Sequence, residues 1–213
     1  MALIQSTAIP SGASDYELEQ SLKFNDDDSA YISKTLGTNS SNRIKTFSCW
    51  FKLGNLGTQR VLTSTTSSGN IEARIEIASD DKIKYVERDS SSGTTDGLFI
   101  STQKLRDVSA FYHLLVSIDT TQSTASNRIK IYLNGVQITA WDTETIPSQN
   151  YDLMLMRSSA VNYIGKDSGS SGYFDGYLAE VNFIDGQALT PADFGETGDY
   201  GEWKPIEYSG TYG

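Results

Sequence analysis

The sequence predicts an all-β protein, an antiparallel sandwich of two sheets. Short segments with the two-residue hydrophobic period of a strand recur along the chain, whereas the 3.6-residue period of a helix is almost absent. Residues 70–78 (NIEARIEIA) are the clearest case, since apolar and charged residues alternate from Ile71 to Ile77. Asn134-Gly135 is the strongest short hairpin signal, because a type I′ turn needs positive φ at both of its central residues.

The expected strands follow one another between turns rich in Gly, Asp, Asn and Ser. They cover residues 21–33 (two strands around an acidic turn), 46–53, 60–65, 70–78, 82–88, 98–102, 111–119, 128–139 (a hairpin), 152–156, 162–165 and 177–184. The last strand lies between two Asp-Gly turns. A short helical turn follows it, with Thr190 as N-cap and Pro191 at the first helical position. This order indicates the strand that closes a sheet.

The periodic segments define one domain, residues 21–194, between an N-terminal arm (1–20) and a C-terminal tail (195–213). A chain of 213 residues can bury roughly 70% of its unfolded surface in one core. Neither terminal segment has a hydrophobic period. The arm has two interpretations that stay open here, a frayed terminus or a segment ordered by a neighbouring subunit.

The composition excludes several classes of function. The formal net charge of −10 argues against a nucleic-acid partner, because affinity for phosphates depends on Lys and Arg. No run approaches 18 apolar residues, so membrane insertion is not expected. The first 20 residues lack the basic region and apolar core of a secretory signal. Cys49 is the only cysteine, so no disulfide forms within the chain and folding in a reducing cytoplasm is expected.

Four stretches together resemble a laminin-G-like, concanavalin-A-like jelly roll. They are SLKFNDDDSAYIS, KTFSCWFKLG, FYHLLVSID with RIKIYLNGVQI, and YIG with YFDGYLAEVNFIDGQALTPADF, in the order of the family. The resemblance covers about residues 21–194. In one respect the sequence departs from the family, because the closing strand reads Ala179-Glu180 where relatives often have two acidic residues. A metal or ion-pair role that needs both carboxylates is therefore in doubt.

The opening and closing stretches have a narrower likeness. MALIQSTAIPSGASDYELEQSLKFNDDDSAYIS and FIDGQALTPADFGETGDYGEWKPIEYSGTYG are similar to structural proteins of marine tailed bacteriophages. In those particles such domains lie in tail fibres or decorate the capsid. The resemblance implies a protein of the virion surface, made in the host cytoplasm.

No set of residues predicts catalysis. Hydrolases related to this fold need several carboxylates on one strand, and the nearest match, Glu87 to Asp89, lacks the last acid. Glu72 and Glu76 share one strand face, but Arg74 lies between them, a pattern we interpret as a solvated face. We therefore expect no enzymatic activity.

His113 is the only histidine, and its alignment with Phe111 and Leu115 favours a structural role. One histidine and one cysteine cannot form a His-based triad or a Cys/His zinc site. On the expected strand 46–53, Trp50 has the opposite register to Phe47 and Phe51, so one of the two faces of this strand is a candidate subunit interface.

Calcium is the candidate cofactor. Asn25, Asp26 and Asp28 place hard oxygen ligands in one turn, as calcium prefers, and Asp80-Asp81 is a second acidic turn. The alternative is that the acidic residues only stabilise the turn by hydrogen bonds between side chain and backbone.

Sugar binding would need exposed aromatic faces with amides and carboxylates nearby. The best set for this purpose is Trp141, Asp142, Tyr151 and Asn162. The alternative is ordinary packing of these residues in the sheets.

The sequence thus leads to a non-enzymatic virion protein that presents a lectin-like domain on a tail fibre or the head surface. Its expected partners are other virion proteins, host surface glycans and further copies of itself, for example in a trimer. The alternative is a purely structural or decoration protein that binds no sugar. A free carbohydrate-binding module is the third possibility.

Overall fold

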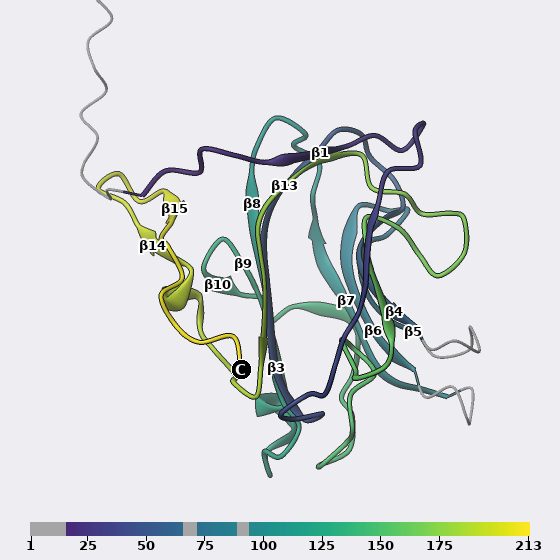
Figure 1. The fold of residues 1–213 in the computed structure, drawn as a ribbon. Coiled ribbons are helices and arrows are strands. Elements are labelled where there is room, and N and C mark those ends of the chain that lie inside the picture. The colour runs from purple at the N-terminus through teal and green to yellow at the C-terminus, as the bar shows by residue number, and fades with distance from the viewer. Residues whose placement is uncertain (1–15, 66–71, 89–93) are drawn as a thin grey trace, which may run out of the picture.

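Two antiparallel sheets pack face to face in the structure, a computed structural model that describes residues 16–65, 72–88 and 94–213 (Figure 1). Sheet A has the strand order β1 (Leu22–Phe24), β13 (Gly176–Asp185), β3 (Ile44–Leu53), β8 (Tyr112–Asp119), β9 (Ile129–Leu133) and β10 (Val136–Gln137). Sheet B has the order β11 (Trp141–Thr145), β7 (Thr95–Lys104), β6 (Lys82–Arg88), β5 (Glu72–Ile77), β4 (Gln59–Thr65), β12 (Val161–Ile164) and β2 (Ile32–Thr35). The predicted fold class is confirmed.

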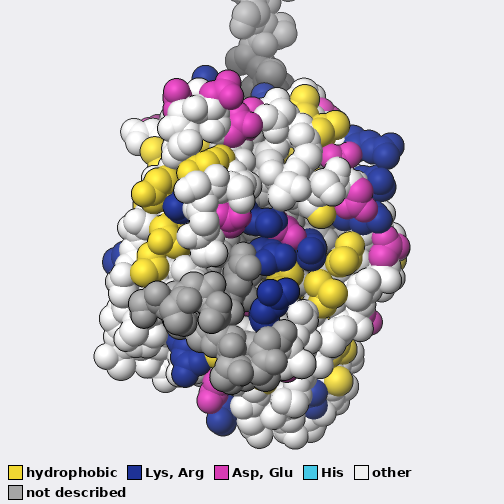
Figure 2. All heavy atoms as spheres, turned by 90° about the vertical axis from the view of Figure 1, so that its right-hand side faces the viewer, with side chains coloured by type: hydrophobic (Ala, Val, Ile, Leu, Met, Phe, Trp, Pro, Cys, Tyr) yellow, Lys and Arg dark blue, Asp and Glu magenta, His cyan; other side chains and the backbone are white. Residues whose placement is uncertain are grey.

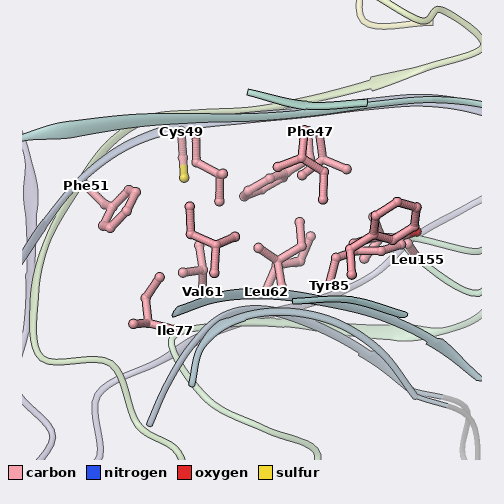
Figure 3. Packing of buried hydrophobic residues seen from close by; sticks show 14 of the residues in the cluster. Phe47, Cys49, Phe51, Val61, Leu62, Ile77, Tyr85 and Leu155 are labelled. Atoms are coloured by element: carbon pink, nitrogen blue, oxygen red, sulfur yellow. The ribbon is translucent and has the colours of Figure 1, made fainter. Parts of the chain in front are cut away.

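The core fills the space between the two sheets. Phe47, Cys49 and Phe51 point from β3 toward Val61 and other apolar residues of sheet B, as Figure 3 shows. These residues alternate along each strand with outward-facing ones, so each sheet contributes one face to a single core. Cys49 is fully buried, and the apolar surroundings raise the pKa of its thiol. It packs as a small apolar residue.

Local turn chemistry explains several elements. Asn134 and Gly135 have φ values of 49° and 78°, as a type I′ turn requires, and they connect β9 to β10. The helical turn after β13 is the 3-10 helix η2 (Pro191–Asp193). The Asp193 carboxylate accepts hydrogen bonds from the backbone N–H of Thr190 at 2.8 Å and from its hydroxyl at 2.9 Å. Another 3-10 helix, η1, spans Ala125–Asn127.

Residues 152–156 do not form the strand that the sequence predicts. They run as irregular chain beside the end of the core, held by buried polar groups. The ammonium of Lys45 donates to the carbonyls of Leu155 and Met156, both at 2.8 Å. The Glu87 carboxylate accepts from the backbone N–H groups of Met154 at 2.8 Å and Leu155 at 3.1 Å. The backbone N–H of Met156 donates to the Ser64 hydroxyl at 2.7 Å. Together these bonds satisfy backbone groups of 154–156 without a neighbouring strand.

The two strands of residues 21–33 belong to different sheets. β1 pairs with β13 in sheet A, and β2 pairs with β12 at the far edge of sheet B. The acidic turn between them therefore crosses from one sheet to the other at one end of the sandwich.

The C-terminal residues lie on sheet A. A small hairpin of β14 (Gly195–Thr197) and β15 (Trp203–Pro205) packs on the face of sheet A that points away from sheet B (Figure 1). Phe194 is buried there against Leu115 and Ile184. In the described parts of the chain, no helix is long and apolar enough to cross a membrane.

Candidate functional site

The four residues expected to bind sugar do not come together. Trp141 lies on β11 and Asn162 on β12, and four strands of sheet B separate these two strands. Asn162 is buried. Its amide oxygen accepts from the Ser64 hydroxyl at 2.6 Å, and its amide nitrogen donates to the Ala160 carbonyl at 3.0 Å. This placement corrects the expectation of one site, since Asn162 belongs to the interior.

The remaining three residues also have partners within the domain. The Trp141 ring packs edge-to-face on Phe99, with 5.2 Å between ring centroids, and is half-buried against the core. Asp142 pairs with Lys82 at 2.7 Å. The hydroxyl of Tyr151 lies 3.3 Å from an Asp96 carboxylate oxygen, and its ring packs against the core. Trp141 therefore does not offer an exposed aromatic face on which a sugar ring could stack.

The acidic turn after β1 is organised by its own hydrogen bonds. The Asn25 amide donates to an Asp28 carboxylate oxygen at 2.7 Å, and the Asn55 amide lies 3.2 Å from an Asp26 oxygen. Burial raises the pKa of the neighbouring Asp175, and the charge of Asp26 raises it further. Among the described residues, no three His, Cys, Asp or Glu side chains are placed to hold a metal ion. The hydrogen bond between Asn25 and Asp28 stabilises the turn, and calcium binding there stays a prediction.

The carboxylate in the hydrolase-like motif is inaccessible. Glu87 is fully buried, and burial raises its pKa. It accepts a hydrogen bond from the Tyr85 hydroxyl at 2.7 Å in addition to the two from the 154–155 backbone. Its neighbour Asp89 lies outside the described residues. Glu87 connects β6 to the 154–155 backbone through these hydrogen bonds, and its burial keeps it away from any substrate.

His113 is buried on the outer face of sheet A. Its ring stacks on Trp50 and on Trp203, with centroids 4.9 Å and 6.0 Å away. The Trp203 indole N–H donates to Nδ1 at 3.0 Å, which leaves the proton on Nε2, 2.8 Å from the Ser48 hydroxyl. Burial lowers the pKa of His113 to about 4. The outer face of β3 that carries Trp50 is thus covered in part by the chain's own tail.

The outer face of sheet B carries a cluster that the sequence did not reveal. Cross-strand pairing aligns Arg60 on β4, Glu76 on β5 and Lys84 on β6. Arg74 lies two residues before Glu76 on the same face. Its Nε is 3.2 Å from Glu76, Lys84 Nζ is also 3.2 Å away, and Arg60 is the third cation in contact.

Glu76 is only 2% exposed, so the interpretation of this face as a simple solvated one is wrong at its centre. The exposed fractions of the cation side chains are larger, 15% for Arg60, 14% for Arg74 and 25% for Lys84. Figure 2 shows Lys and Arg side chains gathered near the middle of this face. We call Arg60, Arg74, Lys84 and their shared carboxylate Glu76 the Glu76 cluster. The charge alternation of β5 was the only sequence signal for it.

Lys166 is a further cation, outside the Glu76 cluster, and it lies near the β12 edge of the same sheet. Lys166 Nζ lies 4.4 Å from the ring centroid of Tyr31 and 4.6 Å from that of Tyr163, so the ammonium is held between two aromatic rings. It also donates to the Gly169 carbonyl at 3.0 Å. Tyr31 remains about half exposed.

An apolar cavity of about 490 Å³ lies where the described chain begins. Residues 16–21 form one wall, and the other side is formed by Trp50, Phe111, Ala179 and Pro205. Burial and a hydrogen bond to Glu180 raise the pKa of Tyr16 to about 12, so this wall is anchored to β13. The cavity adjoins the tail on sheet A and is separate from the Glu76 cluster.

Solved structures of the same fold have low sequence identity to this chain. A heptameric pentraxin from Limulus polyphemus is 14% identical with a TM-score of 0.53, and the match covers 75% of this chain and 71% of the pentraxin. Domain 4 of an extracellular arabinanase from Geobacillus stearothermophilus, solved with arabinotriose, is 21% identical with a TM-score of 0.53, covering 76% and 69%. Laminin α1 domains LG4–5 from mouse are 7% identical with a TM-score of 0.57, covering 88% and 44%.

At these identities the likeness shows a shared fold alone. The chain spans under half the length of the laminin structures and of the NanB sialidase that it matches. No curated protein sequence matches it. A family profile matches residues 24–194, most of the chain and nearly the whole predicted domain. The chain therefore belongs to the concanavalin A-like lectin/glucanases superfamily.

Proposed function

We propose that this chain is a non-enzymatic, glycan-binding adhesion domain on the surface of a bacteriophage particle, and that the outer face of sheet B is its recognition surface. One observation carries the proposal. The chain's own tail packs on the outer face of sheet A, whereas the cations of the Glu76 cluster reach the surface on the outer face of sheet B, where Figure 2 shows Lys and Arg side chains. This cluster is fixed by ion pairs, so its polar groups are oriented before any ligand arrives.

The lectin-like fold supports binding rather than catalysis. Glycoside hydrolysis needs two carboxylates about a ligand, whereas Glu76 is nearly buried among three cations and Glu87 is enclosed in the core. The arabinanase domain of the same fold, solved with arabinotriose, supports a sugar as the ligand. The place on a tail fibre or head rests on the likeness of the opening and closing sequences to phage structural proteins.

Adhesion by such a domain depends on repeated copies. A face with one charged centre binds a single glycan weakly, and many copies on one particle raise the avidity by orders of magnitude. Other virion proteins and further copies of this chain are the partners that this mechanism requires.

A glycan array tests the proposal. The full-length protein, displayed multivalently on beads, should bind a subset of bacterial surface glycans. Lys84→Ala should weaken binding, whereas Lys130→Ala, on the outer face of sheet A, should not. Equal loss in both variants, or retention in both, would exclude the outer face of sheet B as the recognition surface. An array without any bound glycan would overturn the adhesion function.

The second candidate is a purely structural virion protein, and the apolar cavity beside residues 16–21 favours it. The sequence immediately before this wall begins with Met1, Ala2, Leu3 and Ile4, which are apolar. In this function the first residues of a second copy occupy the cavity and link neighbouring subunits. Light scattering tests it, because Leu3→Asp should shift the oligomer toward monomer and Gln5→Asp should not. An unchanged mass in Leu3→Asp would exclude this link.

A further inference from the structure

The turn between β9 and β10 contains a dipeptide that is chemically reactive. In Asn134-Gly135, the backbone nitrogen of Gly135 can attack Cγ of the asparagine side chain, because glycine has no Cβ to obstruct the approach. The sequence contains no other Asn-Gly pair. The residues that form this hairpin turn are therefore also a candidate site of covalent modification.

Two hydrogen bonds hold Asn134 against β8. Its side-chain Oδ1 accepts from the backbone N–H of His113 at 2.8 Å, and its own backbone N–H donates to the His113 carbonyl at 2.8 Å. The φ values of Asn134 and Gly135, 49° and 78°, are those of a type I′ turn. This turn directs the second nitrogen away from the first side chain. The nitrogen of Gly135 therefore reaches Cγ only after the turn has opened.

Trp203 covers the same turn from the C-terminal hairpin. A Cβ added at Gly135 would lie 2.6 Å from a carbon of the Trp203 ring, so the ring packs directly on the glycine. The same indole donates to Nδ1 of His113 at 3.0 Å, and His113 is the residue that binds Asn134. The tail thus contacts both the glycine and the partner of the asparagine. Opening of the turn requires the tail to move.

We propose that Asn134-Gly135 is a deamidation site that the C-terminal tail keeps unreactive. When the tail lifts, hydroxide removes the proton of the Gly135 N–H and the nitrogen bonds to Cγ of Asn134. The side-chain nitrogen takes a proton from water and leaves as ammonia. Water then opens the cyclic imide to aspartate or isoaspartate. Isoaspartate lengthens the backbone of a two-residue turn, so a reacted hairpin loses its register. This inference does not depend on glycan binding.

Mass spectrometry of the full-length protein tests the role of the tail. The natural chain and Trp203→Ala would be incubated at mildly alkaline pH, and aspartate and isoaspartate at position 134 would be measured over time. Trp203→Ala should speed the reaction by about tenfold or more, because its rate follows the population of open turns. Tyr200→Ala, in the same hairpin but with an exposed side chain, should leave the rate unchanged. Equal rates in all three proteins would overturn the role of the tail.

A second asparagine separates local opening from unfolding. Asn39 precedes Ser40, another small residue, and its Nδ2 donates to the Met156 carbonyl at 2.8 Å. Its reaction should proceed at the same rate in Trp203→Ala as in the natural chain. Acceleration at both asparagines would attribute the effect to unfolding of the whole domain and would overturn control by the tail.

The natural chain provides a further test, whether or not the variant folds. Asn134 should react at least about a hundredfold more slowly in the native protein than in denaturant, because the closed turn is protected. Similar rates in the two conditions would show that the folded turn is not protected and would overturn the inference.

Discussion

The indole N–H of Trp203 donates a hydrogen bond to Nδ1 of His113 across 3.0 Å. The two residues are far apart in sequence, and their contact fastens the C-terminal hairpin to the outer face of sheet A. The histidine is enclosed between two indole rings. Its protonation state therefore bears on whether the tail stays attached.

Trp203→Phe should loosen the tail. The phenyl ring keeps much of the packing but removes the donor, which leaves a buried Nδ1 without its bond. We expect the free energy of unfolding to fall by about 1–2 kcal/mol and residues 195–213 to exchange amide hydrogens faster. Denaturant unfolding and hydrogen exchange measure these effects. Tyr200→Phe, in the same hairpin but exposed, is the control. Equal exchange in both variants would contradict a fastening role.

Acid should destabilise the fold through His113. Burial lowers its pKa from 6.5 to about 4, so between these values the unfolded chain binds a proton that the folded chain does not. The free energy of unfolding therefore decreases as the pH is lowered from 6.5 to about 4, by roughly 3 kcal/mol across the whole window. Subtracting the pH profile of His113→Gln isolates this contribution from that of the carboxylates. Two parallel profiles would show that His113 does not titrate in this window.

Lys45→Met should destabilise the protein by about 2–4 kcal/mol, because the carbonyls of Leu155 and Met156 lose their donor and Glu87 loses a nearby positive charge. Amide exchange at 154–156 should rise with it. Lys52→Met, on the same strand, should change stability by no more than about 0.5 kcal/mol. Similar losses of stability in both variants would show that the buried contacts of Lys45 do not stabilise the protein.

Alkaline pH should also act through Lys45. Burial lowers its pKa from 10.5 to about 8, so the unfolded chain binds more protons between these values. The contribution of Lys45 to the free energy of unfolding should therefore rise from pH 8 to 10.5. The difference in unfolding free energy between the natural chain and Lys45→Met measures it. A difference that is flat with pH would rule out this titration.

Glu76→Gln should cost about 2–3 kcal/mol of stability, because Arg60, Arg74 and Lys84 would repel one another without their shared counterion. Added salt should recover part of this loss by screening the repulsion. Glu144→Gln, on the exposed edge strand β11, is the matched control and should be nearly neutral. A neutral Glu76→Gln would show that the cluster does not support the sheet.

Millimolar calcium should leave the melting temperature unchanged, because one carboxylate oxygen of Asp28 already accepts a hydrogen bond from Asn25 and one of Asp26 accepts from Asn55. Thermal unfolding with calcium and with a chelator measures this. A calcium-dependent rise that Asp26→Ala abolishes would restore the acidic turn as a metal site.

Several features followed from short stretches of sequence. The alternation of residues 70–78, the Asn134-Gly135 turn and the Thr190 cap depend on neighbours in the chain. The structure confirms the alternation from Ala73 to Ile77, the turn and the cap, and residues 70 and 71 lie outside the described residues. The prediction of a strand at 152–156 was wrong, because an apolar run forms a strand only where a neighbouring strand accepts and donates its backbone hydrogen bonds. There the bonds to Lys45 and Glu87 take the place of a neighbouring strand.

The sequence by itself determined the fold class, the turns and which residues of a strand share a face, because the two-residue period and turn propensities are local. Only the tertiary structure decided which faces meet. Cross-strand register brought Arg60 and Lys84 to Glu76, and the order of sheet B separated Trp141 from Asn162. Register depends on pairing between segments distant in the chain, and no local pattern of side chains specifies that pairing.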